Sequence, residues 1–70
     1  MGSKTMIILY IYHQLIINGK IQMKDVINKY NISIRTFHRY ISDIKTFLYD
    51  NYIYDEVVYD HFNKLYVLKK

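Results

Sequence analysis

Basic and hydroxyl side chains recur at helical spacing between residues 33 and 46, and they are the residue types in this chain that could act on an anion. Positions three and four residues apart share one face of a helix. One such face would carry, in order, Arg35, His38, Arg39, Ser42 and Thr46. Guanidinium, imidazole and hydroxyl groups donate hydrogen bonds to phosphate oxygens and to base edges. A charged helix face is also commonly just solvated, so the pattern by itself leaves both interpretations open.

The net charge of +4 is concentrated in the same part of the 70-residue chain. Residues 20–46 contain six Lys or Arg and two Asp, whereas residues 47–70 contain three Lys and four Asp or Glu. Lys4 supplies the remaining positive charge. A basic, helical centre favours a polyanionic partner.

Groups for catalysis or metal binding form no recognisable pattern. His13, His38 and His61 fall in different predicted elements without ligand spacing, and the chain has no cysteine. It also lacks a glycine-rich phosphate loop and any local signature of a nucleophile, a histidine and an acid. We therefore expect no enzyme activity, no metal and no cofactor.

Length and composition favour one small domain, because 70 residues with 51% apolar content can fill a single core. The longest apolar run, residues 6–17, is shorter than the roughly 20 residues of a membrane helix. Residues 18–20, Asn-Gly-Lys, do not form a signal-peptide cleavage site. Together with the absence of cysteine, this favours a cytoplasmic protein. Residues 1–3 resemble a cloning remnant, so the expected domain spans residues 4–70.

A first helix is expected over residues 4–18, ending at Gly19, which tolerates the left-handed conformation. Spacings of three and four predict its inward stripe, made of Ile8, Ile11, Tyr12, Leu15 and Ile16. A second apolar line is either the edge of a wide core face or a surface for a partner; it consists of Ile7, Tyr10 and Ile17.

Two more helices are expected in the middle of the chain. A short extended segment at 20–22 directs Ile21 inward and leads to a helix at about 23–30, after which Asn31 suits a positive φ. Ser33 is a strong N-cap for a third helix over residues 34–49. Ile32, before the cap, and Phe37, the fourth residue of this helix, are placed to form a hydrophobic staple. The inward stripe of this helix is predicted as Phe37, Ile41, Ile44 and Leu48.

Two β-forming runs predict a hairpin after residue 51. Residues 57–59 and 66–67 flank the polar break at 61–64. The side chains expected to point into the core are Tyr59, Tyr66 and Leu68. The expected order is helix, short strand, helix, helix, strand, strand, which defines an α+β domain.

The two central helices, joined by residues 31–34, form a predicted helix-turn-helix. Residues 33–39, Ser-Ile-Arg-Thr-Phe-His-Arg, resemble the V-S-x-R-T-I-x-R-D-I signature of bacterial winged helix-turn-helix regulators. These are the deoxyribonucleoside-regulator-like domains, including those at the N-terminus of WYL-domain transcription factors. The resemblance covers nearly all of residues 4–68; residues 21–30 match the first motif helix, and residues 57–60 and 65–68 match the wing strands. It implies a winged helix with three helices, a short strand and a two-stranded β-hairpin wing. It also implies sequence-specific binding of double-stranded DNA, with helix 34–49 in the major groove.

The sequence departs from the family pattern at several positions. Tyr40 stands where the family usually has an acid, Ile27 replaces a small residue between the motif helices, and Leu65 replaces a glycine before the wing tyrosine. The hairpin is also less basic than expected, because Asp55, Glu56 and Asp60 lie close by. These departures bear more on the wing than on the recognition helix.

The resemblance implies distinct roles for the basic face. Arg35 and Thr36 would hold phosphate, while His38 and Arg39 would face the bases. The full set of residues expected at DNA is Ser33, Arg35, Thr36, His38, Arg39, Ser42, Lys24 and Lys64. We expect a homodimer, formed through a domain missing from this chain or through the first helix. One alternative is a winged helix that binds proteins through the apolar face of helix 4–18 or the acidic hairpin. Another is single-strand binding through surface tyrosines.

Overall fold

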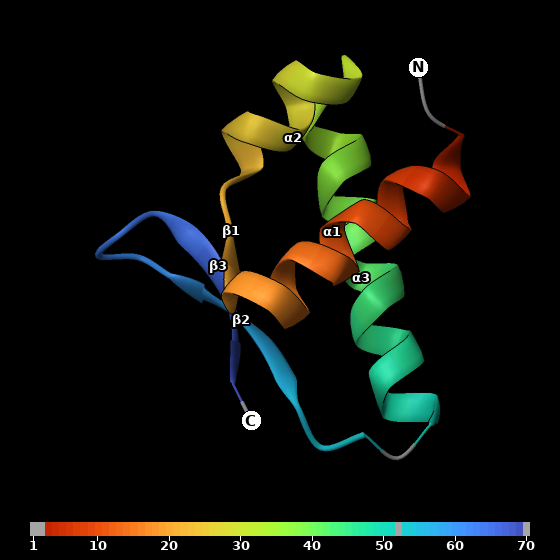
Figure 1. The fold of residues 1–70 in the computed structure, drawn as a ribbon, viewed down its shortest axis with the longest axis vertical. Coiled ribbons are helices and arrows are strands. Elements are labelled where there is room, and N and C mark those ends of the chain that lie inside the picture. Colours follow the sequence, from red (N-terminus) through yellow and green to blue (C-terminus); the bar gives the residue numbers. More distant parts are fainter. Residues whose placement is uncertain (1–2, 52, 70) are drawn as a thin grey trace.

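The computed structural model describes residues 3–51 and 53–69 (Figure 1). Its elements follow in the order α1 (Lys4–Asn18), β1 (Lys20–Ile21), α2 (Met23–Tyr30), α3 (Ile34–Asp50), β2 (Glu56–Asp60) and β3 (Leu65–Lys69). The described part is thus an α+β arrangement of three helices and a three-stranded antiparallel sheet. This confirms the predicted order of elements. Within these ranges, no helix has the length and apolar character needed to cross a membrane.

Helix α1 begins and ends where expected, but its inward face is rotated from the predicted one. Ser3, placed outside the expected domain, is the N-cap: its side chain accepts a hydrogen bond from the Met6 N–H at 3.3 Å. Gly19 ends the helix with φ 76°, and its N–H donates to the Leu15 carbonyl at 2.9 Å. The buried line of α1 consists of Ile7, Ile11 and Leu15.

One prediction on α1 is therefore wrong, because Ile16, predicted to point inward, is exposed. The two alternatives left open for the second apolar line are divided between its members: Ile7 is a core residue, whereas Ile17 is exposed. The physical reason for the exposure of Ile16 is that a step of four residues rotates by about 40° around the helix, so the line of Ile8, Tyr12 and Ile16 turns progressively away from the core. Ile8 and Tyr12 are only partly buried against the core. Ile16, the last residue of that line, is exposed to solvent.

Helices α2 and α3 meet at a tight break. Asn31 adopts φ 54°, as expected of a residue that accepts the left-handed region. Gln22 makes no capping hydrogen bond at the start of α2, whereas Ser33 caps α3 with its side chain. The predicted inward stripe of α3 is confirmed, and Tyr40 joins it; the buried residues of the helix are Phe37, Tyr40, Ile41, Ile44 and Leu48.

The sheet has the strand order β1-β3-β2, with both pairs antiparallel. Strand β1 joins it through Lys20 opposite Val67 and Ile21 opposite Tyr66. The hairpin is in register from Glu56 opposite Lys69 to Asp60 opposite Leu65. The three-stranded sheet thus ties the segment after α1 to the C-terminal hairpin.

The prediction that Tyr59 points into the core is wrong, because this side chain is exposed. Residues two apart share one side of a strand, so Tyr59 is on the same side as Val57, which is buried. Tyr59 lies nearer the turn, where the hairpin extends past the core. There its ring packs edge-on against Tyr66 at 5.0 Å between centroids. Tyr66 and Leu68 are partly buried against the core.

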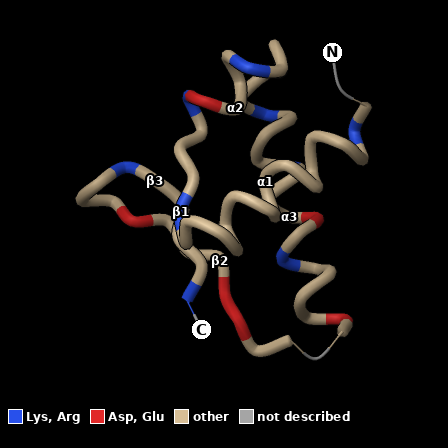
Figure 2. The backbone as a smooth tube through the Cα atoms, in the orientation of Figure 1, with Lys and Arg blue, Asp and Glu red and all other residues tan. Residues whose placement is uncertain are grey.

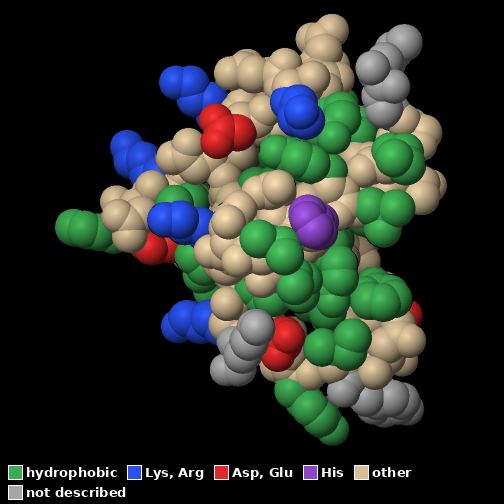
Figure 3. Space-filling view, in the orientation of Figure 1, with side chains coloured by type: hydrophobic (Ala, Val, Ile, Leu, Met, Phe, Trp, Pro, Cys, Tyr) green, Lys and Arg blue, Asp and Glu red, His purple; other side chains and the backbone are tan. Residues whose placement is uncertain are grey.

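The core is apolar and draws on five of the six elements; its members are Ile7, Ile11, Leu15, Ile21, Val26, Phe37, Tyr40, Ile41, Ile44, Leu48 and Val57. No polar or charged side chain in the described residues is buried. Charged residues therefore lie on the outside of the fold (Figure 2). Apolar side chains that the core does not take up gather over the outward face of α1 (Figure 3).

Candidate nucleic-acid interface

Ser33 and Thr36 define the start of α3 through two mutual hydrogen bonds. The Ser33 hydroxyl oxygen accepts from the Thr36 backbone N–H at 3.1 Å, and its hydroxyl donates to Thr36 Oγ1 at 2.9 Å. Ser33 has extended backbone angles, as an N-cap requires. Capping is thus the observed role of this pair. The Thr36 hydroxyl keeps its own hydrogen as a donor.

The five polar residues predicted on the outer face of α3 are all exposed; they are Arg35, His38, Arg39, Ser42 and Thr46. The buried stripe that begins at Phe37 holds the opposite face against the core. In the described part of the chain, the single ion pair joins Lys4 Nζ to Asp43 Oδ2 at 3.5 Å, so neither Arg35 nor Arg39 is in one. Their guanidinium groups are therefore available to an external anion.

Lys24 and Lys64 lie outside α3 and are also exposed. Lys24 is in the first turn of α2, and Lys64 closes the hairpin turn with φ 56°. Figure 2 shows basic residues at the start of α2 and at the hairpin turn, along one edge of the molecule, each with an acidic residue nearby. Lys64 takes the left-handed conformation just before Leu65, so this turn closes without a glycine.

The hairpin turn is organised by Asp60. Its carboxylate accepts hydrogen bonds from the backbone N–H groups of Phe62 and Asn63 at 3.0 and 3.1 Å, and from Asn63 Nδ2 at 2.8 Å. The side-chain hydrogen bond from Asn63 is the main reason that the pKa of Asp60 lies below its ordinary value. Asp60, an acidic residue of the predicted wing, thus stabilises the hairpin turn through these hydrogen bonds.

A shallow groove lies between α3 and the sheet and adds Lys45 to the predicted site residues. It is lined by His38, Ile41, Ser42, Lys45 and Tyr66. The His38 and Tyr66 rings are 6.5 Å apart. Lys45 continues the row from His38 and Ser42 at spacings of four and three, and this periodicity was the signal that could have found it.

Tyr66 connects this groove to the hairpin. Its ring lies 5.5 Å from that of Phe37 and 5.0 Å from that of Tyr59, and Tyr59 in turn lies 4.7 Å from His61. Partial burial, with a smaller contribution from Tyr59, raises the pKa of Tyr66 above its ordinary value. Tyr66 therefore remains a protonated hydrogen-bond donor at neutral pH.

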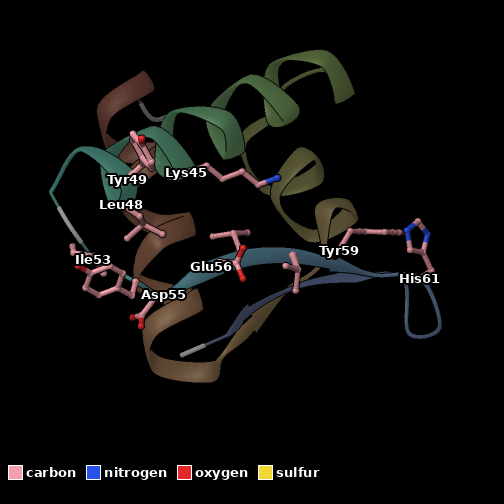
Figure 4. A pocket seen from close by; sticks show the side chains of 11 residues that line it. Lys45, Leu48, Tyr49, Ile53, Asp55, Glu56, Tyr59 and His61 are labelled. Atoms are coloured by element: carbon pink, nitrogen blue, oxygen red, sulfur yellow. The ribbon is translucent and has the colours of Figure 1, made fainter.

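A second, larger hollow lies between the C-terminal half of α3 and β2 (Figure 4). Lys45 reaches along α3 above the strand, and Tyr59 and His61 lie toward the hairpin turn. Asp55 and Glu56 line the other part of the hollow. The two carboxylates make that part of the hollow unfavourable for an anion.

The described residues contain no group of three or more His, Asp or Glu side chains able to hold a metal ion. Comparison of the chain with known protein families, with curated proteins and with solved structures gave no match.

Proposed function

We propose that this chain binds double-stranded DNA in a sequence-specific manner, as the winged helix-turn-helix domain of a cytoplasmic bacterial transcription regulator. The observation that carries the proposal is the exposed row on α3, which has Arg35 and Arg39 at its N-terminal end and no acidic side chain between them. The net charge of +4 supports a polyanionic partner.

The proposed docking places the first half of α3 in the major groove. An α-helix fits this groove, and residues near its N-terminus reach base edges in helix-turn-helix complexes. Arg39 lies one helical turn beyond Arg35, so it can reach a guanine edge while Arg35 meets phosphate. His38, on the same exposed face, is the second candidate for base contact.

The phosphate contacts are assigned to the start of α3 and to its flanks. The Thr36 N–H donates to Ser33, but the N–H groups of Ile34 and Arg35 lack intrahelical acceptors, and the positive end of the helix dipole favours an anion there. The Thr36 hydroxyl can donate to the same phosphate. Lys24 on α2 and Lys64 on the hairpin are the proposed lateral contacts, and Lys45 is added from the groove beside β3.

Salt dependence tests this proposal, because neutralising phosphates releases counterions. With four phosphate contacts, the logarithm of the association constant for random duplex should fall with the logarithm of salt concentration at a slope of about −3.6. In the R35A variant this slope should be less steep by about 0.9, which is the contribution of one phosphate contact.

Lys69→Ala is the matched control, because it removes one positive charge at the end of β3, at the opposite end of Figure 1 from the start of α3. This variant should keep the full slope. A slope near zero for the unmodified chain would overturn the proposal. Equal slopes for R35A and the unmodified chain would remove Arg35 from the interface.

A further inference from the structure

The outward face of α1 is apolar and has no partner within the described chain. Its most exposed large side chains are Met6 at 59%, Leu9 at 55% and Ile17 at 64%. A shallow open groove runs along the helix on this face; it is lined by Met6, Leu9, Tyr10, Tyr12, His13, Ile16 and Tyr30. Figure 3 shows this face directly, with hydrophobic side chains gathered over α1. Monomeric proteins rarely leave such a contiguous patch in water.

The patch is also uncharged. No Asp, Glu, Lys or Arg occurs between Thr5 and Asn18. At its borders, Lys4 is paired with Asp43, and the Lys29 ammonium lies 5.4 Å from the centre of the Tyr10 ring. An uncharged patch can face a copy of itself without placing like charges in opposition. This is the requirement of a two-fold interface, in which the same surface meets itself.

We propose that this face of α1 binds the same face of a second copy of the chain. The spacing of the exposed line supports a copy over another apolar partner, because Met6, Leu9, His13 and Ile16 follow intervals of three, four and three. This pattern is symmetric about its midpoint. In an antiparallel helix pair it sets Met6 opposite the partner's Ile16, and Leu9 opposite the partner's His13.

The size of the patch indicates a weak, reversible dimer. A 15-residue helix is about 22 Å long. Contact along one such helix buries roughly half of the ~800 Å² per partner that is typical of standard interfaces. The association should therefore dissociate in the micromolar range. In Figure 1, α1 lies in front of α3, and the exposed row of α3 faces away from the core, so pairing leaves that row open. The dimer does not depend on DNA binding.

Sedimentation equilibrium of the complete chain without DNA tests the proposal. The unmodified chain should show a concentration-dependent doubling of mass. The double variant L9K/I16K should weaken association at least tenfold. Tyr54→Lys is the matched control, because Tyr54 is 90% exposed and lies outside the α1 face; it should leave association unchanged. Circular dichroism checks that each variant folds. If L9K/I16K does not fold, the single variant Ile17→Lys is used in its place.

Cross-linking tests the register independently. The chain has no cysteine, so a single introduced one is a unique handle. An equal mixture of the L9C and H13C variants should give mixed disulfide dimers in clearly more than the half expected from random pairing. The proposal is overturned if the chain stays monomeric at millimolar concentration, if Tyr54→Lys weakens association as much as L9K/I16K, or if cross-links form without preference for the mixed pair.

Discussion

Replacing Phe37 with alanine tests whether α3 is held in the orientation that exposes its basic row. Phe37 is 0% exposed, and its ring lies 5.5 Å from that of Tyr66, so it joins α3 to the sheet. Truncating a fully buried Phe costs about 3–5 kcal/mol, from the lost transfer free energy and the cavity left behind. A 70-residue domain has a total stability of only about 3.5–10 kcal/mol.

The expected result is a loss of most of the free energy of unfolding. At about 4–8 °C per kcal/mol for a domain of this size, the melting temperature should fall by at least about 12 °C. Urea denaturation followed by circular dichroism measures the free energy directly, and thermal denaturation measures the shift.

Phe47→Ala is the matched control, because it removes the same side chain from the same helix at a position that is 50% exposed. Phe47 contacts Tyr12 edge-on at 6.1 Å between centroids, a pair worth about 1 kcal/mol. If Phe37→Ala melts within a few degrees of the unmodified chain, or if Phe47→Ala costs as much, the assignment of buried and exposed faces on α3 is refuted.

Three smaller predictions follow from the caps and the turn. Ser33→Ala should cost about 1 kcal/mol of unfolding free energy by removing the cap, whereas Thr46→Ala on the exposed face of the same helix should cost clearly less. Gly19→Ala should destabilise by about 1 kcal/mol through its φ of 76° alone, because nothing lies within 4 Å of the added Cβ; Gly19→Asn should cost less in the same denaturation assay. Asn63→Ala should raise the pKa of Asp60 toward its ordinary value, as followed by NMR titration. Because folding lowers the pKa of Asp60, its ionised carboxylate stabilises the fold above the ordinary Asp pKa, and this stabilisation is lost as the pH falls through the lowered pKa. An unchanged titration of Asp60 in the Asn63→Ala variant would contradict the prediction.

Residues with strong local signals were predicted well from the sequence. Ser33 and Asn31 marked the break before α3 because capping and positive φ are properties of single residues and their neighbours. The stripe on α3 was predictable because polar residues at helical spacing, from Arg35 to Thr46, mark the opposite face of the helix. On α1 both faces are apolar, so periodicity could not fix the rotation: Ile7 was left open between core and surface, and Ile16 was wrongly predicted to point inward.

The same limit applies to the candidate interface. The exposure of Arg35 and Arg39 followed from the position of Phe37 on the opposite face. The groove beside Tyr66 could not be predicted in this way. It depends on how closely the hairpin approaches α3, and this contact joins segments that are distant in sequence. Tyr59 was misplaced for a related reason: strand alternation gives the side of the sheet but not where the core ends along the strand.

Comparing Arg39→Ala with Arg35→Ala on two duplexes tests the proposed function most directly. A preferred duplex is first selected from a random pool, and the affinities for it and for random duplex are then measured at one salt concentration. Arg39→Ala should weaken binding to the preferred duplex by about 1–3 kcal/mol more than binding to random duplex, since a bidentate base contact is lost. Arg35→Ala should weaken both equally, because a phosphate contact carries no sequence information. If both variants keep the full affinity of the unmodified chain for both duplexes, the basic row on α3 is only a solvated helix face and the proposed function is wrong.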